Sequence, residues 1–275
     1  MRQFCKVLLC VVLGLNATAA AAQDAPVPAP SEAQDLVAPP NWAFNDLACA
    51  PRMISKPPDV TLRVVGSQDT AIRSMLGPGD TLVITGGSAA NMQTGDRYYV
   101  RRVRKFSPPN AKKDQLTVHT VGWIQVLGVD TNIATATVVH ACDGILLDDY
   151  LEPFTPPQIA ARPMPGSTPQ YENMGQIALG DEGMMTAGAG QLMTIDRGSK
   201  DGVVPGQRFV VFRDKRKIKI DPRGMSRPFM DMSSKLPLVE IGQVLVLSVR
   251  EEDSTVQVVV SKDAVLTGDL VAPLR

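Results

Sequence analysis

The stretch 196–212 reads DRGSKDGVVPGQRFVVF and places Gly198, Gly202 and Gly206 four residues apart, ahead of an apolar run. A phosphate-binding P-loop needs G-x-x-x-x-G-K-[ST] between a strand and a helix, because backbone N–H groups and the helix N-terminus must converge on the anion. Here Lys200 precedes the second glycine, and the strand-like run RFVVF follows the third. The stretch therefore predicts turns that bring one strand back beside another.

Two dipeptides are expected to form these turns. Asp201-Gly202 offers a glycine for positive φ, and Pro205-Gly206 predicts a second turn. We expect the apolar Val203 between them to close the end of a small barrel.

The same pattern occurs earlier in the chain. Segment 79–102 aligns without a gap with 190–213, and segment 122–153 aligns with 242–273. The coinciding residues include turn glycines, arginines and aspartates: Gly87 with Gly198, Gly95 with Gly206, Arg102 with Arg213, Asp143 with Asp263, and Asp149 with Asp269. A unit of about 90 residues thus occurs twice, which predicts internal duplication.

The first copy differs from the second at one turn position. Asn91 stands where the second copy has Gly202, and Asn is among the residues that best tolerate positive φ. Met92 correspondingly takes the place of Val203. A turn allows this substitution, whereas a phosphate cradle does not.

Both copies are predicted to be β throughout. Short runs such as TLVIT, RYYVRRV and IATATVV alternate inward and outward residues between Gly, Asp, Asn and Pro, and no stretch keeps helical apolar spacing for three turns. We therefore predict an all-β fold of two tandem small β-barrel or sandwich units. The expected boundaries are a signal peptide at 1–22, a disordered tether at 23–40, β-unit 1 at 41–155, a Pro-rich linker at 156–170 and β-unit 2 at 171–275.

The N-terminus predicts export. Arg2 and Lys6 precede an apolar core at 7–15, and Ala20 and Ala22 form an A-x-A cleavage site. The apolar run is shorter than the roughly 20 residues that a spanning helix needs, so no transmembrane span is expected after cleavage. We expect the mature protein in the periplasm or cell envelope.

Cleavage of the signal leaves two cysteines, Cys49 and Cys142. In an oxidising compartment one disulfide between them would stabilise the fold by about 4 kcal/mol in the chain-entropy model. Two free buried thiols are the alternative, because a sequence does not show whether the Cα atoms approach one another. No CxxC or HxxxH spacing occurs, so we predict no metal site and no cofactor.

The mature chain is close to neutral. The signal removes two of the 28 basic residues and none of the 28 acidic ones, which leaves 26 against 28 and does not favour nucleic acid as a partner. Basic residues instead gather between the same two strands of each copy, at 101–105 and at 213–228, where seven basic residues accompany two acidic ones. We predict that these basic hairpins contact an anionic envelope polymer, a lipid headgroup or an acidic envelope protein; solvated loops without a partner are the alternative. The residues assigned to this face are Arg101, Arg102, Arg104, Lys105, Lys215, Arg216, Lys217 and Lys219.

These patterns resemble a known family. The motif G-x-x-x-G-V-x-x-G-x-x-F-x-V at 198–211, followed by a variable basic loop and G-x-x-x-V-x-x-V at 242–249, resembles the C-terminal β-domain of flagellar assembly protein T. It is also similar to the β-repeats of bacterial envelope proteins in which two such units follow a peptidoglycan-binding LysM domain. The resemblance covers roughly 60–275, and this chain has no recognisable LysM segment. It implies a binding or assembly module without catalysis.

Catalytic groups are scarce in the sequence. His119 and His140 are the only histidines, and His140 with Cys142 suggests a Cys/His dyad. The second copy carries Val260 and Lys262 at the positions of His140 and Cys142, so the repeated scaffold does not need them. We therefore predict no catalytic residue and a binding or assembly role. A flagellum-associated structural component and a hydrolase that uses the His140/Cys142 region are the alternatives.

Overall fold

Strands dominate the chain in the computed structural model, which describes residues 35–68, 75–106, 115–180, 184–214 and 238–275. Strands account for 51% of these described residues and helices for 8%, which confirms the predicted all-β class. The predicted signal peptide lies outside the described residues. In the part of the chain that is described, no helix has the length and apolar character needed to cross a membrane.

The first sheet contains six antiparallel strands in the order β3-β4-β7-β6-β5-β8. These strands are β3 (Val64–Ser67), β4 (Thr81–Thr85), β5 (Arg97–Phe106), β6 (Gln115–Val129), β7 (Ile133–Ala141) and β8 (Tyr150–Pro153). A seventh strand, β2 (Arg52–Ile54), pairs with β6. The two ends of the sheet meet through a bridge between Arg63 and Tyr150 and a backbone hydrogen bond of 2.9 Å from Val64 to Asp149.

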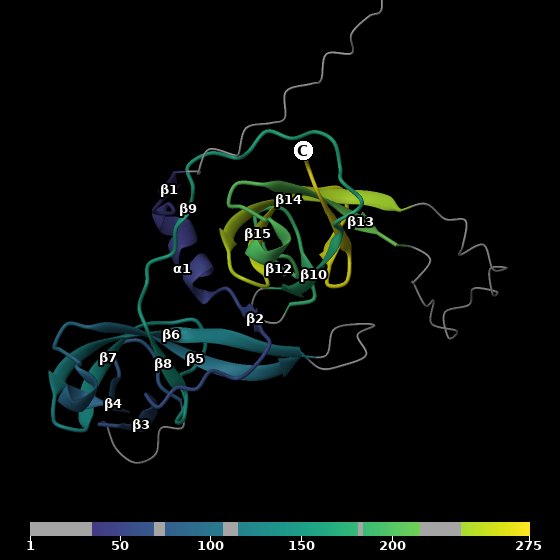
Figure 1. Ribbon diagram of the computed structural model, residues 1–275. Helices are drawn as coiled ribbons and strands as arrows, with labels where there is room; N and C mark the ends of the chain where they lie inside the picture. The colour runs from purple at the N-terminus through teal and green to yellow at the C-terminus, as the bar shows by residue number, and fades with distance from the viewer. Residues whose placement is uncertain (1–34, 69–74, 107–114, 181–183, 215–237) are drawn as a thin grey trace, which may run out of the picture. The chain divides into compact units, whose positions relative to one another are not determined.

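The second sheet is a closed barrel in the order β10-β12-β15-β14-β13-β17, as the ring of strands in Figure 1 shows. Its strands are β10 (Gly175–Gly180), β12 (Leu192–Ile195), β13 (Arg208–Arg213), β14 (Val239–Val249), β15 (Ser254–Ser261) and β17 (Leu270–Pro273). Each occupies the place that its aligned segment holds in the first sheet. The short pair β11 (Thr186–Ala187) and β16 (Val265–Leu266) likewise matches the bridge between Leu76 and Ile145. The aligned segments thus share one strand order, while their origin by duplication stays a prediction.

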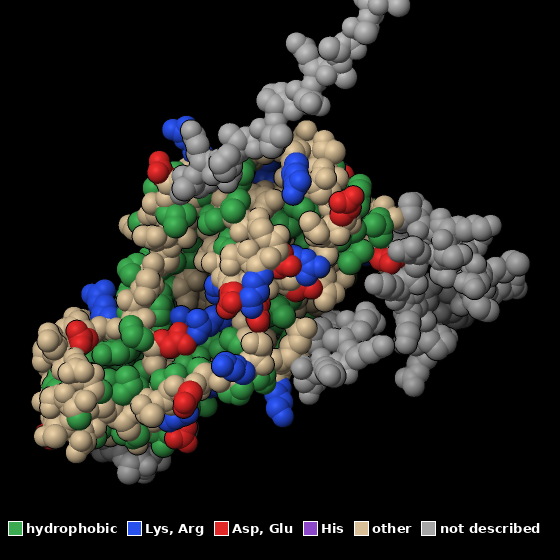
Figure 2. Space-filling model, in the orientation of Figure 1, with side chains coloured by type: hydrophobic (Ala, Val, Ile, Leu, Met, Phe, Trp, Pro, Cys, Tyr) green, Lys and Arg blue, Asp and Glu red, His purple; other side chains and the backbone are tan. Residues whose placement is uncertain are grey.

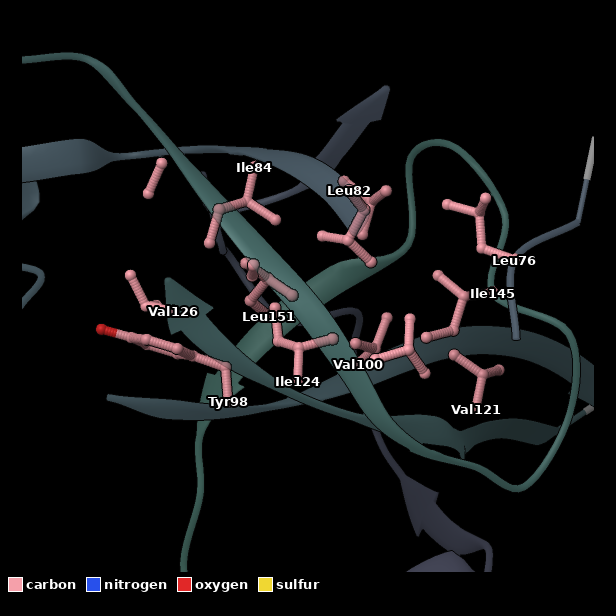
Figure 3. Packing of buried hydrophobic residues seen from close by; sticks show 14 of the residues in the cluster. Leu76, Leu82, Ile84, Tyr98, Val100, Val121, Ile124, Val126, Ile145 and Leu151 are labelled. Carbon is pink, nitrogen blue, oxygen red and sulfur yellow. The ribbon is translucent and has the colours of Figure 1, made fainter. Parts of the chain in front are cut away.

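Each sheet encloses its own apolar core. In the first unit the inward residues of alternating strands, including Leu82, Ile84, Ile124 and Leu151, are almost fully buried and meet in Figure 3. The second core contains Phe209 with a set of valines. Because side chains on a strand alternate between its faces, every second residue of strands such as β4 and β7 lies in the interior.

Helix α1 (Asn41–Cys49) was not predicted, because its nine residues are too short for a three-turn apolar pattern. Its half-buried Phe44 meets Trp123 of β6 edge to face, at 6.0 Å between ring centroids. The helix ends at Cys49, which forms a disulfide with Cys142 at a Cα separation of 5.7 Å. The structure therefore has the disulfide and not the alternative of two free thiols.

The described ends of the predicted tether and linker are paired with one another. β1 (Leu36–Val37), from the segment expected to be a disordered tether, forms a ladder with β9 (Ile159–Ala160) of the Pro-rich linker. Further along the linker, Ser167 and Thr168 donate backbone hydrogen bonds of 3.0 Å to Arg275. These segments are held because their backbone groups find partners, which composition alone did not indicate.

Candidate functional site

The glycine stretch connects two strands through one short turn of 3-10 helix. β12 leads into η3 (Ser199–Asp201), and β13 follows. Gly202 ends the turn with φ +77°, and Gly206 has φ +83°. In the first unit η1 (Gly87–Ala90) ends at Asn91, with φ +59°, and Gly95 has φ +94°. The backbone geometry is that of the predicted turns, with a strand where a P-loop requires a helix.

Two of these glycines also allow a close approach of the backbone. A Cβ added to Gly87 would lie 2.3 Å from the carbonyl oxygen of Asp130. At Gly198 a Cβ would lie 2.5 Å from the carbonyl oxygens of both Arg250 and Glu251, although its φ of −133° is ordinary. Met92 and Val203 are buried beside these turns, each in the core of its own unit.

The arginines predicted to form the basic face of the first unit do not lie in a loop. Arg101, Arg102, Arg104 and Lys105 all belong to β5, whose long pairing with β6 continues to Phe106. The loop assignment was wrong because the alternating pattern of β5 runs straight through the charged residues. Lys215, Arg216, Lys217 and Lys219 lie outside the described residues.

Arg102 is held by Asp149, and the second unit has the same pair of residues at the aligned positions. Its Nε and Nη2 donate to the two carboxylate oxygens of Asp149, and its Nη2 also donates to the carbonyl oxygen of Gly144. Arg213 makes the equivalent contacts with Asp269 and Ala264. The hydrogen bond to the buried aspartate raises the pKa of each arginine above its ordinary value. These arginines hold the turn before the last strand of their unit.

Arg101 is buried rather than exposed, with 9% of its surface accessible. It donates to the Thr120 hydroxyl, stacks over the Tyr99 ring at 4.3 Å, and lies 3.3 Å from the Glu152 carboxylate through Nε. Arg52 donates to the other oxygen of the same carboxylate. Burial, followed by repulsion from Arg52, lowers the pKa of Arg101 to about 10.

The exposed part of the predicted face is smaller than the sequence indicated. Arg104 is 46% exposed and pairs with Asp143 at 2.8 Å, and Lys105 is exposed at the end of β5. On the face drawn in Figure 2, basic and acidic side chains lie next to one another. Among the described residues of segment 101–105, Lys105 near the end of β5 therefore carries the positive charge that has no described carboxylate partner.

The cysteine and histidine region does not offer a thiolate. The Cys142 sulfur is bonded to Cys49, and the sulfurs and a His140 ring nitrogen lie within 4.8 Å of one another. This is the one group of its kind in the described part of the chain, and its sulfurs would have to be reduced before they bound a metal. Trp123 stacks on the His140 ring at 4.3 Å, and burial lowers the pKa of both His140 and His119.

The sequence did not predict two of the cavities of the structure. A largely apolar one of about 230 Å³ lies between α1, the linker and the outer face of the second barrel, with Asp46 and Arg162 in its lining. A second, of about 480 Å³, is lined by Arg63, Arg101 and Tyr150 among others. Their walls come from segments far apart in the chain, which no local pattern brings together.

Comparison with known proteins adds no family to this geometry. No protein-family model matches the chain, and no curated protein matches it either.

Proposed function

We propose that this protein is an exported binding or assembly module of the bacterial cell envelope that acts without catalysis and without a cofactor. The observation that carries the proposal is the shared strand order of the two units, in which β5 with its basic segment 101–105 and β13, which the basic sequence 213–228 follows, hold equivalent places. The exposed Lys105 of the first unit and the basic sequence at 215–219 of the second carry positive charge that suits an anionic polymer such as peptidoglycan, or an acidic envelope protein.

The disulfide supports export. Disulfides form and persist in oxidising compartments, and the bond between Cys49 and Cys142 agrees with the signal-like N-terminus. The bond also argues against a hydrolase that uses Cys142, because a sulfur in a disulfide is not a nucleophilic thiolate.

The resemblance to flagellar assembly protein T supports a narrower alternative, a structural component associated with the flagellum. Co-purification with isolated basal bodies is the result expected for this alternative. Normal motility and normal basal bodies after deletion of the gene would eliminate it.

The decisive experiment neutralises the second basic hairpin. In the quadruple variant Lys215→Gln, Arg216→Gln, Lys217→Gln and Lys219→Gln, we expect weaker retention on isolated cell wall or outer membrane. Retention of the unchanged protein should fall as salt is raised, because exposed charges are screened beyond about 10 Å at 0.1 M ionic strength.

A matched control removes four exposed basic residues outside segments 101–105 and 213–228: Lys56→Gln, Arg97→Gln, Lys262→Gln and Arg275→Gln. The net charge of the two variants is the same, so a loss confined to the hairpin variant assigns the contact to the hairpin. Equal retention of both variants, insensitive to salt, would exclude the basic hairpins as the contact.

A further inference from the structure

The cavity beside Arg101 is bordered by more positive than negative charge. Its volume is about 480 Å³, within the roughly 300–1,000 Å³ of small-molecule sites, and its wall includes Arg63, Arg101, Arg102 and Tyr150. Pro57 and Pro58 also line it. The cavity is therefore large enough for an anionic group together with part of the molecule that carries it.

The charges of this region do not balance. Five guanidinium groups accompany four carboxylates in the cavity wall and its ion pairs: Arg52, Arg63, Arg101, Arg102 and Arg104 against Asp143, Asp148, Asp149 and Glu152. Asp149 is taken by Arg102, and one carboxylate, Glu152, serves both Arg52 and Arg101. Arg63 donates to the backbone carbonyl of Asp148, at 2.8 Å, rather than to a carboxylate. One positive charge is left over in a partly buried place, where an anion would be attracted.

The same cluster holds donors that lack a hydrogen-bond partner. Among the described residues, six buried side-chain atoms have none, and three of them lie here: Arg52 Nε, Arg101 Nε and Tyr150 Oη. Tyr150 is 4% exposed, and Arg101 Nε lies 3.3 Å from Glu152 without hydrogen-bond geometry. Buried polar groups are nearly always satisfied in folded proteins, and Arg101 Nε has the Glu152 carboxylate nearby, so the two remaining donors, Arg52 Nε and Tyr150 Oη, favour an acceptor that the chain does not supply.

The second unit shows that the fold does not need this cluster. At the positions of Arg101, Tyr150 and Glu152 it carries Phe212, Leu270 and Ala272, which pack in a hydrophobic cluster. A well-packed apolar group is often at least as stable as a buried ion pair. We therefore infer that the charged residues of the first unit have a role other than stabilising the fold.

We propose that the cavity beside Arg101 binds a phosphate group, either as free phosphate or as part of a larger molecule. Guanidinium groups match phosphate oxygens through paired N–H donors, and a tetrahedral group accepts from several directions at once. Arg101 and Arg63 contact the group from the cavity wall, and Arg52, which shares the Glu152 carboxylate with Arg101, adds to the positive potential. This proposal rests on other residues than Lys215, Arg216, Lys217 and Lys219 and does not depend on envelope binding.

The test is calorimetric titration of the full mature chain with inorganic phosphate at constant ionic strength. We expect one phosphate per chain, and at least about a tenfold loss of affinity in Arg101→Gln, which is the fold-change for loss of one charged hydrogen-bond partner. A second variant copies the second unit with Arg101→Phe, Tyr150→Leu and Glu152→Ala. It is expected to stay folded by circular dichroism and to bind no phosphate.

Arg97→Gln is the matched control, because Arg97 is an exposed arginine of the same strand that does not line the cavity. Unchanged affinity in this variant assigns the loss to the cavity. Absence of saturable phosphate binding by the folded unchanged protein, or equal affinity in Arg101→Gln, overturns the proposal.

Vesicles distinguish the two sources of the group. Retention on phosphatidylcholine vesicles that contain phosphatidic acid, reversed by inorganic phosphate, assigns a lipid headgroup, whereas phosphate binding without retention assigns a soluble phosphate compound. All these variants leave Lys215, Arg216, Lys217 and Lys219 unchanged, so failure here is distinguishable from failure of the hairpin proposal.

Discussion

Arg102 donates hydrogen bonds from Nε and Nη2 to the two carboxylate oxygens of Asp149, at 2.8 and 2.7 Å. The same carboxylate accepts the backbone N–H of Leu146 at 2.8 Å. The second unit repeats the arrangement with Arg213, Asp269 and Leu266. In each unit one arginine thus ties a strand to the turn that precedes the last strand. The arginine and the aspartate that coincide in the aligned sequences form the same ion pair in both units.

Removal of this arginine should destabilise each unit. Arg102→Gln leaves a carboxylate that is 4% exposed without its ionic partner, and we expect a loss of about 3 kcal/mol in the free energy of unfolding. Arg213→Gln should cost about as much, because Asp269 is 6% exposed. Urea unfolding followed by circular dichroism measures both.

The control for this pair is Arg104→Gln. Its salt bridge with Asp143 joins two half-exposed side chains, so the expected loss is below about 1 kcal/mol. Equal losses for Arg102→Gln and Arg104→Gln would show that burial of the aspartate does not matter.

The disulfide should contribute strongly to stability. Its two cysteines are separated by 93 positions, and the chain-entropy model gives about 4–5 kcal/mol for a loop of that length. The double variant Cys49→Ser and Cys142→Ser should therefore unfold at markedly lower urea. A dithiol reductant should lower the midpoint of the unchanged protein and leave that of the double variant where it is.

The two kinds of glycine should respond differently to alanine. Gly87→Ala combines φ +56° with a contact of 2.3 Å to a backbone oxygen, so we expect a loss of about 3 kcal/mol or more. At Gly202, with φ +77° and no atom within 4 Å of the added Cβ, only the left-handed strain of about 1–2 kcal/mol remains. Thermal unfolding of the two variants compares them, and a larger loss at Gly202 would contradict the assignment of Gly87 to a close approach.

Stability should fall in mild acid through His119. Burial, with Arg104 next in importance, lowers the pKa of its imidazole, so the folded state binds the proton more weakly than the unfolded state does. The stability is therefore present above the unfolded pKa of about 6.5 and is lost as the pH falls below it.

The measurement is the urea midpoint of the unchanged protein and of His119→Gln at about pH 7.5 and about pH 5.5. The unchanged protein should lose more stability between these values than His119→Gln does. Parallel losses would assign the acid sensitivity to other groups.

The predictions that succeeded rest on local chemistry. Positive φ at Gly202 and Asn91 follows from the turn dipeptide and its tolerated substitute. Burial of Met92 and Val203 follows from apolar residues between turns, and the all-β class follows from alternation. Helix α1 was missed because its nine residues give too short a pattern.

The expectation that Arg101 and Arg102 lie in an exposed loop was wrong for a different reason. A basic residue is expected to be exposed when the sequence shows no acidic partner for it. The partners Asp149 and Glu152 lie about 50 positions away along the chain, so no local pattern indicated them. The repeat did contain a usable signal for one of them, because Arg102 and Asp149 recur together as Arg213 and Asp269.

The amino-acid sequence by itself determined the strands, the turns between them and the twofold pattern, because alternation and backbone preference act between near neighbours. Only the tertiary structure decided which charges are paired, that Arg101 is buried, and that Cys49 meets Cys142. Those outcomes depend on which distant segments the closed sheets bring within a few ångströms, and Coulomb attraction, burial and disulfide bonding act only at that range.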